Sequence, residues 1–241
     1  MRIVDLHSWD VSHAEAIRLQ ETLRGQVIVE NRLGDVRAVA GVDVAVQGDV
    51  ARAAVVVLRY PELDPLEVVC AERPVAFPYV PGLLAFREAP AVLAGCAELR
   101  TEPDLFLFDG HGLAHPRRMG LACHLGLCLD KPAIGCAKSR LCGEQEELAP
   151  DAGAWVPLRD GPEIIGAVVR TRQGTKPVYV SIGHKVDLET AICYVLATCR
   201  PSHAGDRAYR LPEPCRLAHR AAQSAGGYSS SRVTTSSSVP R

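Results

Sequence analysis

The distribution of apolar and polar positions divides the chain into a valine-rich first half and a second half in which helices alternate with short strands. Three apolar segments separated by short polar breaks, residues 36–46, 51–60 and 66–75, predict an antiparallel meander. Apolar residues at helical spacing follow at 83–100, and the run at 105–108 predicts a short buried strand. Most strands of the sheet are therefore expected in the first half of the chain, ahead of most of the helices that cover it.

A helix precedes the meander, and further helices and strands follow it. Ser12 and Glu15 form a capping-box pattern ahead of a helix over 16–23, and Gly25 follows its end. The remaining predicted elements are helices at 117–130 and 187–199 and strands at 133–137, 163–171 and 177–183. This order predicts an α/β fold in which a mixed central sheet, an antiparallel meander followed by alternating helices and strands, is covered by packed helices.

The chain is expected to form one domain over residues 1–223. The remaining residues, 224–241, are rich in Ser and Thr and poor in large apolar groups, so a disordered tail is predicted there. No apolar run approaches the roughly 20 residues that cross a bilayer. Residues 1–15 carry acids and histidines where a signal peptide needs an apolar stretch, so a cytoplasmic protein is expected.

Composition excludes few functions. The 241 residues have a net charge of −1, which gives no general electrostatic attraction for nucleic acid, so such binding must depend on local clusters. The nine cysteines are odd in number and form no Cys-x-x-Cys pair, so free thiols in a reducing compartment are favoured over disulfides or zinc.

Three acids occupy positions where a purely structural carboxylate is unusual. Asp43 interrupts the valine-rich segment "AVAGVDVAV", Glu88 lies on an inward-facing helix, and Asp109 ends the strand "LFLFDG". Burying them without compensation is costly, and if the strands of Asp43 and Asp109 are neighbours, the acids form an all-oxygen cluster that suits Mg²⁺ or Mn²⁺. The alternative is structural: Asp43 facing solvent, Glu88 paired with a nearby arginine, and Asp109 capping the next turn.

Five blocks point to one family: "YVPGLLAFREAP", "LFLFDGHGLAHPRRMGLACHLGL", "PAIGCAKSRLCG", "VSIGHKVDLETA" and "RLPEPCRLAH". In this order, over about 10–222, the chain resembles endonuclease V. The resemblance implies an RNase H-like fold and Mg²⁺-dependent hydrolysis of the second phosphodiester bond on the 3′ side of deoxyinosine or inosine, leaving 3′-hydroxyl and 5′-phosphate ends. Mn²⁺ is expected to substitute for Mg²⁺, and the cellular role implied is repair of deaminated adenine in DNA.

The resemblance also assigns roles to residues. It implies metal binding by Asp43, Glu88 and Asp109, with His219 assisting at a second metal position, and Lys138 stabilising the phosphate or orienting the nucleophile. Tyr79 is expected to act as a wedge beside the displaced base. The other residues assigned to substrate binding are Pro81, Gly82, Leu84, Arg87, Gly110, Gly112, His115, Arg117, Arg118 and His184.

Two other functions remain open at this point. One is a non-catalytic reader of inosine-containing nucleic acid on the same fold, and the other is a metal-dependent phosphatase, which the absence of an Asp-x-Asp pattern disfavours. The sequence does not distinguish deoxyinosine in DNA from inosine in RNA. A monomer without membrane partners is expected.

Overall fold

The computed structural model describes residues 1–199 and 209–224, and the tail expected over 224–241 lies, apart from its first residue, outside the described residues. Its elements are α1 (His13–Leu23), η1 (Arg24–Gln26), β1 (Ala38–Gln47), β2 (Val50–Arg59), β3 (Pro65–Pro74), α2 (Leu84–Glu98), β4 (Leu105–Phe108), α3 (Leu121–Leu129), β5 (Ala133–Ala137), β6 (Glu144–Gln145), β7 (Trp155–Asp160), β8 (Glu163–Val169), β9 (Val178–His184), α4 (Leu188–Thr198) and α5 (Glu213–Gln223).

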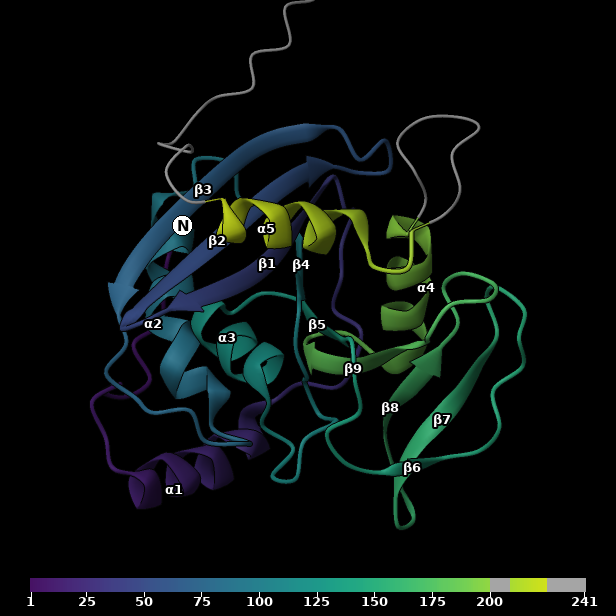
Figure 1. The fold of residues 1–241 in the computed structure, drawn as a ribbon, viewed down its shortest axis with the longest axis horizontal. Helices are drawn as coiled ribbons and strands as arrows, with labels where there is room; N and C mark the ends of the chain where they lie inside the picture. The colour runs from purple at the N-terminus through teal and green to yellow at the C-terminus, as the bar shows by residue number, and fades with distance from the viewer. Residues whose placement is uncertain (200–208, 225–241) are drawn as a thin grey trace, which may run out of the picture.

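Within the described ranges the strands form one nine-stranded sheet in the order β3-β2-β1-β4-β5-β9-β8-β7-β6 (Figure 1). The first three strands pair antiparallel, as the meander predicts, while β4 runs parallel to both β1 and β5. The mixed sheet expected from the sequence is therefore confirmed. The parallel strands at its centre matter for function, because parallel neighbours end at the same edge of a sheet.

Helices cover both faces of the sheet. Side chains alternate in direction along a strand, so β4 sends Leu105 and Leu107 to one face and Phe106 and Phe108 to the other. The first pair packs in a core with α4 and α5, and the second packs with α2 and α3. Figure 1 shows α5 crossing one face of the long β1–β2 ribbon, with α2 and α3 on the other.

Several elements were not foreseen from the pattern of the chain. The strands β6 and β7 extend the sheet beyond β8, and α5 occupies a segment for which only a sequence motif was noted. The capping box is present as predicted, because the Ser12 hydroxyl accepts the Glu15 N–H and the Glu15 carboxylate accepts the Ser12 N–H. None of the helices in the described part of the chain is long and apolar enough to cross a membrane.

Candidate active site

Two carboxylates meet where the parallel pairing of β1 and β4 ends. The register pairs Val42 of β1 with Phe108 of β4, which places the next residues, Asp43 and Asp109, side by side. The Asp109 N–H donates to the Val42 carbonyl oxygen at 3.0 Å and continues the strand pairing to this point. The juxtaposition expected if these strands were neighbours is therefore present, and the alternative in which Asp43 faces solvent from an edge strand is wrong.

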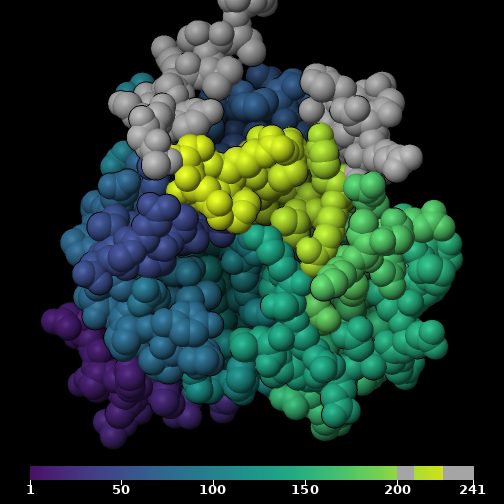
Figure 2. Space-filling model, viewed as in Figure 1, coloured from purple at the N-terminus to yellow at the C-terminus, as the bar shows by residue number. Residues whose placement is uncertain are grey.

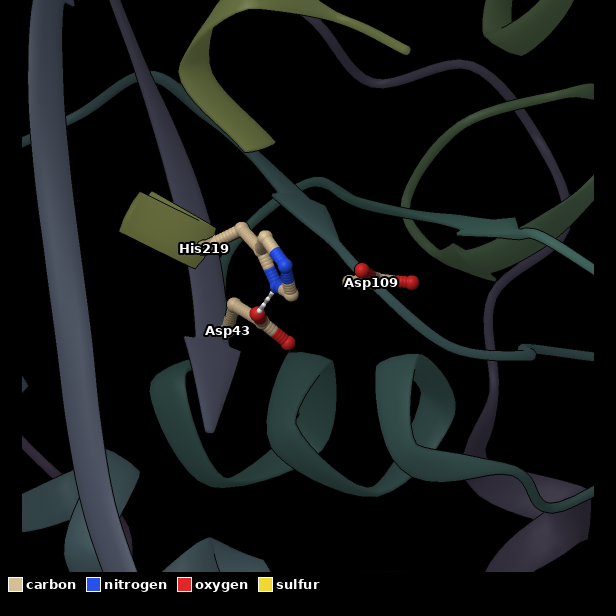
Figure 3. A group of neighbouring side chains, drawn as sticks. All are labelled: Asp43, Asp109 and His219. Atoms are coloured by element: carbon tan, nitrogen blue, oxygen red, sulfur yellow. Dashed lines mark hydrogen bonds and ion pairs between the residues drawn. The ribbon is translucent and has the colours of Figure 1, made fainter. Parts of the chain in front are cut away.

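His219 of α5 completes the cluster. Its Nδ1 lies 2.6 Å from Oδ2 of Asp43, and Figure 3 shows the two side chains pointing toward one another, with Asp109 beside them at the end of β4. One ligand atom from each of Asp43, Asp109 and His219 lies within 4.8 Å of the others, which is the spacing of groups that bind one ion. Carboxylate oxygens with one imidazole nitrogen suit a hard or borderline divalent cation.

The electrostatics of the pair favour a bound cation. The side chains of Asp43 and Asp109 are only 13% and 11% exposed. Burial and the neighbouring charge of Asp109 raise the pKa of Asp43, and the hydrogen bond from His219 only partly offsets them. Two carboxylates that repel one another in a partly buried site are stabilised when positive charge lies between them. The residues present therefore fit a divalent metal ion.

Glu88 belongs to the same acidic region but lies outside the group of ligand atoms just described. It is on α2, and burial, followed by the charges of Asp43 and Asp109, raises the pKa of Glu88 to about 8. Arg87 lowers that pKa only weakly, and the Arg87 guanidinium donates to the Phe77 carbonyl oxygen. The structural alternative, in which an ion pair explains the partly buried Glu88, has no support in these contacts.

Lys138 supplies positive charge to the cluster. It follows β5 directly, and its Nζ forms an ion pair with Asp109 Oδ2. Burial lowers the pKa of Lys138, but the hydrogen bond and charge of Asp109 outweigh burial and raise it. The side chain remains 37% exposed, so its ammonium group lies at the edge of the cluster, where an incoming phosphate can reach it.

A pocket of about 220 Å³ adjoins the acids. Its lining includes Gly110, which follows Asp109, and Ser139, which follows Lys138, so the pocket and the charged cluster share their chain segments. Figure 2 shows the surface hollowed beneath α5, the helix that carries His219. Six predicted substrate-binding residues line the pocket: Tyr79, Pro81, Gly82, Leu84, Gly110 and His115.

Tyr79 differs from the other lining residues in its exposure. The side chain is 70% exposed at the pocket mouth, although tyrosine usually buries much of its ring. Tyr79 therefore does not pack in the core. An exposed aromatic ring beside a cavity is well placed to stack on a nucleic-acid base.

Other lining residues were not expected from the sequence: Gln20, His111, Ser139 and Leu141. Ser139 and Leu141 could have been found, because the loop after a central strand that carries Lys138 is where binding residues gather. Gln20 gave no comparable signal, because a polar residue on a helix is usually exposed.

Five predicted substrate-binding residues do not line the pocket: Arg87, Gly112, Arg117, Arg118 and His184. His184 is buried at the other end of β9, opposite the first residue of β5, where its Nδ1 accepts the Ile28 N–H. Gly112 packs against β9, because a Cβ there would lie 2.0 Å from the Ile182 carbonyl oxygen.

Arg117 and Arg118 contact protein groups. The Arg118 guanidinium forms ion pairs with Asp160 and Glu163, both at 2.8 Å, which attach its loop to the β7–β8 hairpin. The Arg117 guanidinium donates to the side-chain oxygen of Gln20 and to the Gly82 carbonyl oxygen. Both arginines had been expected to bind phosphates of the substrate. In the structure their guanidinium groups instead bind protein groups from distant segments of the chain.

A mixed sheet covered by helices on both faces, with two carboxylates where the pairing of its parallel strands ends, is typical of metal-dependent nucleases of the RNase H-like class. Residues 21–220 match the family model described as Endonuclease V. The chain belongs to the endonuclease V family, whose members hydrolyse phosphodiester bonds in nucleic acid, as the five sequence blocks had indicated.

Individual relatives cover nearly the whole chain. Endonuclease V of Roseiflexus castenholzii is 55% identical over 212 residues, which are 88% of this chain and 92% of the relative. The crystal structure of endonuclease V from Streptomyces avermitilis superposes with a TM-score of 0.83 at 41% identity, covering 92% of this chain and 96% of that one. Endonuclease V of Ciona intestinalis, in complex with a 24mer DNA containing an inosine followed by a ribo-adenosine, gives a TM-score of 0.73 at 29% identity, covering 87% and 95%. The predicted RNase H-like fold is confirmed.

Proposed function

We propose that this endonuclease recognises deoxyinosine in DNA and hydrolyses the second phosphodiester bond on its 3′ side, leaving 3′-hydroxyl and 5′-phosphate ends. The observation that carries the proposal is the junction of Asp109 and Gly110, at which the acidic cluster and the pocket meet in consecutive residues. A base held in the pocket would leave its own backbone close to the carboxylates. The Ciona relative bound to inosine-containing DNA supports the choice of lesion.

Asp43, Asp109 and Glu88 would hold Mg²⁺, with His219 close enough to assist at a second position. Mg²⁺ prefers oxygen ligands, and Mn²⁺ accepts the same ligands together with an imidazole nitrogen. When bound, the ion supplies a water of lowered pKa and stabilises the charge that develops on the phosphate oxygens. In the protein itself, the His219 hydrogen bond orients the Asp43 carboxylate.

Lys138 and Tyr79 have separate tasks in this proposal. Lys138, paired with Asp109 at the edge of the cluster, would hold a phosphate oxygen or orient the nucleophile. Tyr79 would stack where the extruded nucleotide leaves the helix. Extrusion costs a few kcal/mol and costs least at a weak base pair, which favours lesions over intact pairs.

The pocket would distinguish hypoxanthine from adenine through main-chain groups. Gly82 and Gly110 lie on its wall and bring backbone donors and acceptors within reach of a base edge. Hypoxanthine carries an oxo group and a protonated N1 where adenine carries an amino group and an acceptor. A buried polar group left unpaired costs about 1–3 kcal/mol, which provides selectivity.

We further propose that residues 1–223 act as one catalytic domain, as a monomer, with deoxyinosine in DNA as the main target and inosine in RNA as a possible second substrate. The competing function is a reader that binds inosine without cutting. The test incubates the protein and Mg²⁺ with labelled strands that carry one inosine, as DNA and RNA, single- and double-stranded. A nick one nucleotide beyond the lesion is expected, and equal cutting of matched adenosine strands, or binding without a nick, would contradict the proposal.

A further inference from the structure

The Gly82 carbonyl oxygen receives three hydrogen bonds from side chains that come from two other segments of the chain. The donors are Gln20 Nε2 at 3.0 Å, His115 Nε2 at 2.9 Å and Arg117 Nη2 at 2.8 Å. Gly82 lies on the pocket wall directly after Pro81, with a φ of +80°, so its backbone needs glycine. The position of this wall is therefore fixed by polar contacts as well as by packing.

Gln20 connects two segments of the chain that contribute residues to the pocket. Its amide nitrogen donates to the carbonyl oxygens of Gly82 and Met119, both at 3.0 Å, and its amide oxygen accepts from Arg117 Nε at 2.6 Å. Met119 precedes Gly120, which lines the same pocket as Gly82. The Gln20 side chain thus uses both ends of its amide to join segments about 60 and 100 residues away in sequence.

Burial makes these hydrogen bonds important. Gln20 is 1% exposed, on a helix whose neighbouring polar residues face solvent. A buried amide that loses a partner leaves a desolvated polar group, whereas an exposed amide exchanges its partner for water. The contacts of Gln20 therefore resist rearrangement when the pocket opens or fills.

His115 is held in one protonation state by the same network. Its Nε2 must carry the hydrogen, because the Gly82 carbonyl only accepts, and its Nδ1 accepts from the Arg117 N–H at 3.1 Å. Burial, assisted by the charge of Arg117, lowers the pKa of His115 to about 4. A neutral ring held by both nitrogens acts as a support for Gly82, and its nitrogens are not available to a phosphate.

We propose that Gln20 is a positioning residue for base recognition, which sets the spacing between the Gly82 wall and the Met119–Gly120 wall of the pocket. The inference rests on the proposed function, because it assigns lesion selectivity to that spacing. Gln20 acts through the main-chain groups that it holds and takes no part in the hydrolysis. A small change in the spacing misplaces backbone donors and acceptors that must match one base edge.

The sharpest variant is Gln20→Glu, which keeps the size and the acceptor for Arg117 but replaces the donor nitrogen by an oxygen that faces two carbonyls. We expect kcat/KM on the inosine strand to fall by about tenfold or more, because the variant loses both hydrogen bonds that the amide nitrogen donates. Cutting of an undamaged strand, measured at high enzyme concentration, should not change. Selectivity, the ratio of these two rates, therefore falls as cutting of the inosine strand falls.

The matched control is Gln26→Glu, the same chemical change at an exposed position beyond the end of α1. Its two rates should equal those of the unaltered protein. Gln20→Met provides a second test that introduces no charge and preserves volume, and thermal unfolding identifies any variant that does not fold. If Gln20→Glu fails to fold, Gln20→Met should show the same selective loss.

Two outcomes overturn the inference. One is an unchanged inosine preference in folded Gln20→Glu or Gln20→Met protein, and the other is an equal fall in both rates, which indicates a general structural role. Failure of the proposed function is distinguishable, because the unaltered protein would then show no preference for inosine. That result would remove the basis of the inference as well.

Discussion

Asp43 and His219 lie 176 residues apart in the chain, yet the Asp43 carboxylate accepts a hydrogen bond from the imidazole at 2.6 Å. The contact joins β1 to α5 at the end of the sheet where Asp109 also lies (Figure 3). A carboxylate held in this way is oriented before any ligand arrives, which reduces the cost of organising a metal site. The pair therefore provides the first two tests of the site.

Asp43→Asn should reduce cleavage of inosine-containing DNA by about a hundredfold or more, because metal-assisted charge stabilisation is worth several kcal/mol. Binding of the same DNA should persist, since the pocket lies beside the carboxylates and not between them. Cleavage is followed on labelled strands and binding by gel shift with Ca²⁺ in place of Mg²⁺. Full activity in this variant would show that the cluster is not the catalytic site.

His219→Ala should raise the Mg²⁺ concentration needed for half-maximal cleavage by about tenfold, because loss of a group that orients a metal-binding carboxylate weakens metal affinity. The measurement is a metal titration of the initial rate, started from chelator-treated protein. Arg220→Ala, on the exposed side of the same helix, is the control and should leave the half-saturating concentration unchanged. Equal metal curves for all three proteins would contradict a role for His219.

Glu88 predicts how the stability of the metal-free protein depends on pH. Burial and the charges of Asp43 and Asp109 raise its pKa from 4.5 to about 8, so between these values the folded protein holds a proton that the unfolded chain releases. The unfolded state then binds fewer protons, and the free energy of unfolding falls as the pH rises through this interval. Protein in chelator should therefore lose thermal stability from pH 5 to pH 8.

The variant Glu88→Gln isolates the contribution of the Glu88 carboxyl group to this pH dependence. Glu88→Gln cannot ionise, so its melting temperature should fall less over the same interval and exceed that of the unaltered protein at pH 8. Asp43, whose pKa is raised by burial, contributes in the same direction and is retained in both proteins, so the difference between their curves reports Glu88. Parallel curves would mean that Glu88 is already ionised in the folded state.

Tyr79→Ala should reduce cleavage at inosine by about tenfold, since stacking of a base on an aromatic ring is worth about 1–3 kcal/mol. The melting temperature should change little, because the ring is 70% exposed. Tyr79→Phe keeps the ring and should keep most of the activity. An unchanged preference for inosine over undamaged DNA in Tyr79→Ala would exclude the wedge role.

The acidic pair was predictable because its position follows from strand order alone. Once the segments of Asp43 and Asp109 are read as neighbouring strands, their pairing brings the two acids together where β4 ends. The meander was predictable for a similar reason, since its strands follow one another with short breaks. In both cases the order of the strands determines which residues become neighbours.

Contacts between distant segments were not predictable in this way. Arg118 was expected to hold phosphate, but its partners Asp160 and Glu163 come from a hairpin more than 40 residues away. Gln20 gave no sign of burial, because the carbonyls that satisfy it belong to loops whose course depends on the whole fold. For Arg118 and Gln20, the role of the side chain depends on partners from distant segments more than on the residue type.

Gly112 provides a final test of this distinction. It was expected to let the main chain approach the base, but a Cβ at this position would lie 2.0 Å from the Ile182 carbonyl oxygen of β9. Gly112→Ala should therefore lower the free energy of unfolding by about 1–3 kcal/mol, the usual cost of overpacking, and reduce activity in proportion to the folded fraction. Gly34→Ala, where no atom lies within 4 Å of the added methyl group, is the control in denaturant titrations. A stable Gly112→Ala protein that has lost inosine selectivity would instead support a direct role of Gly112 in base recognition.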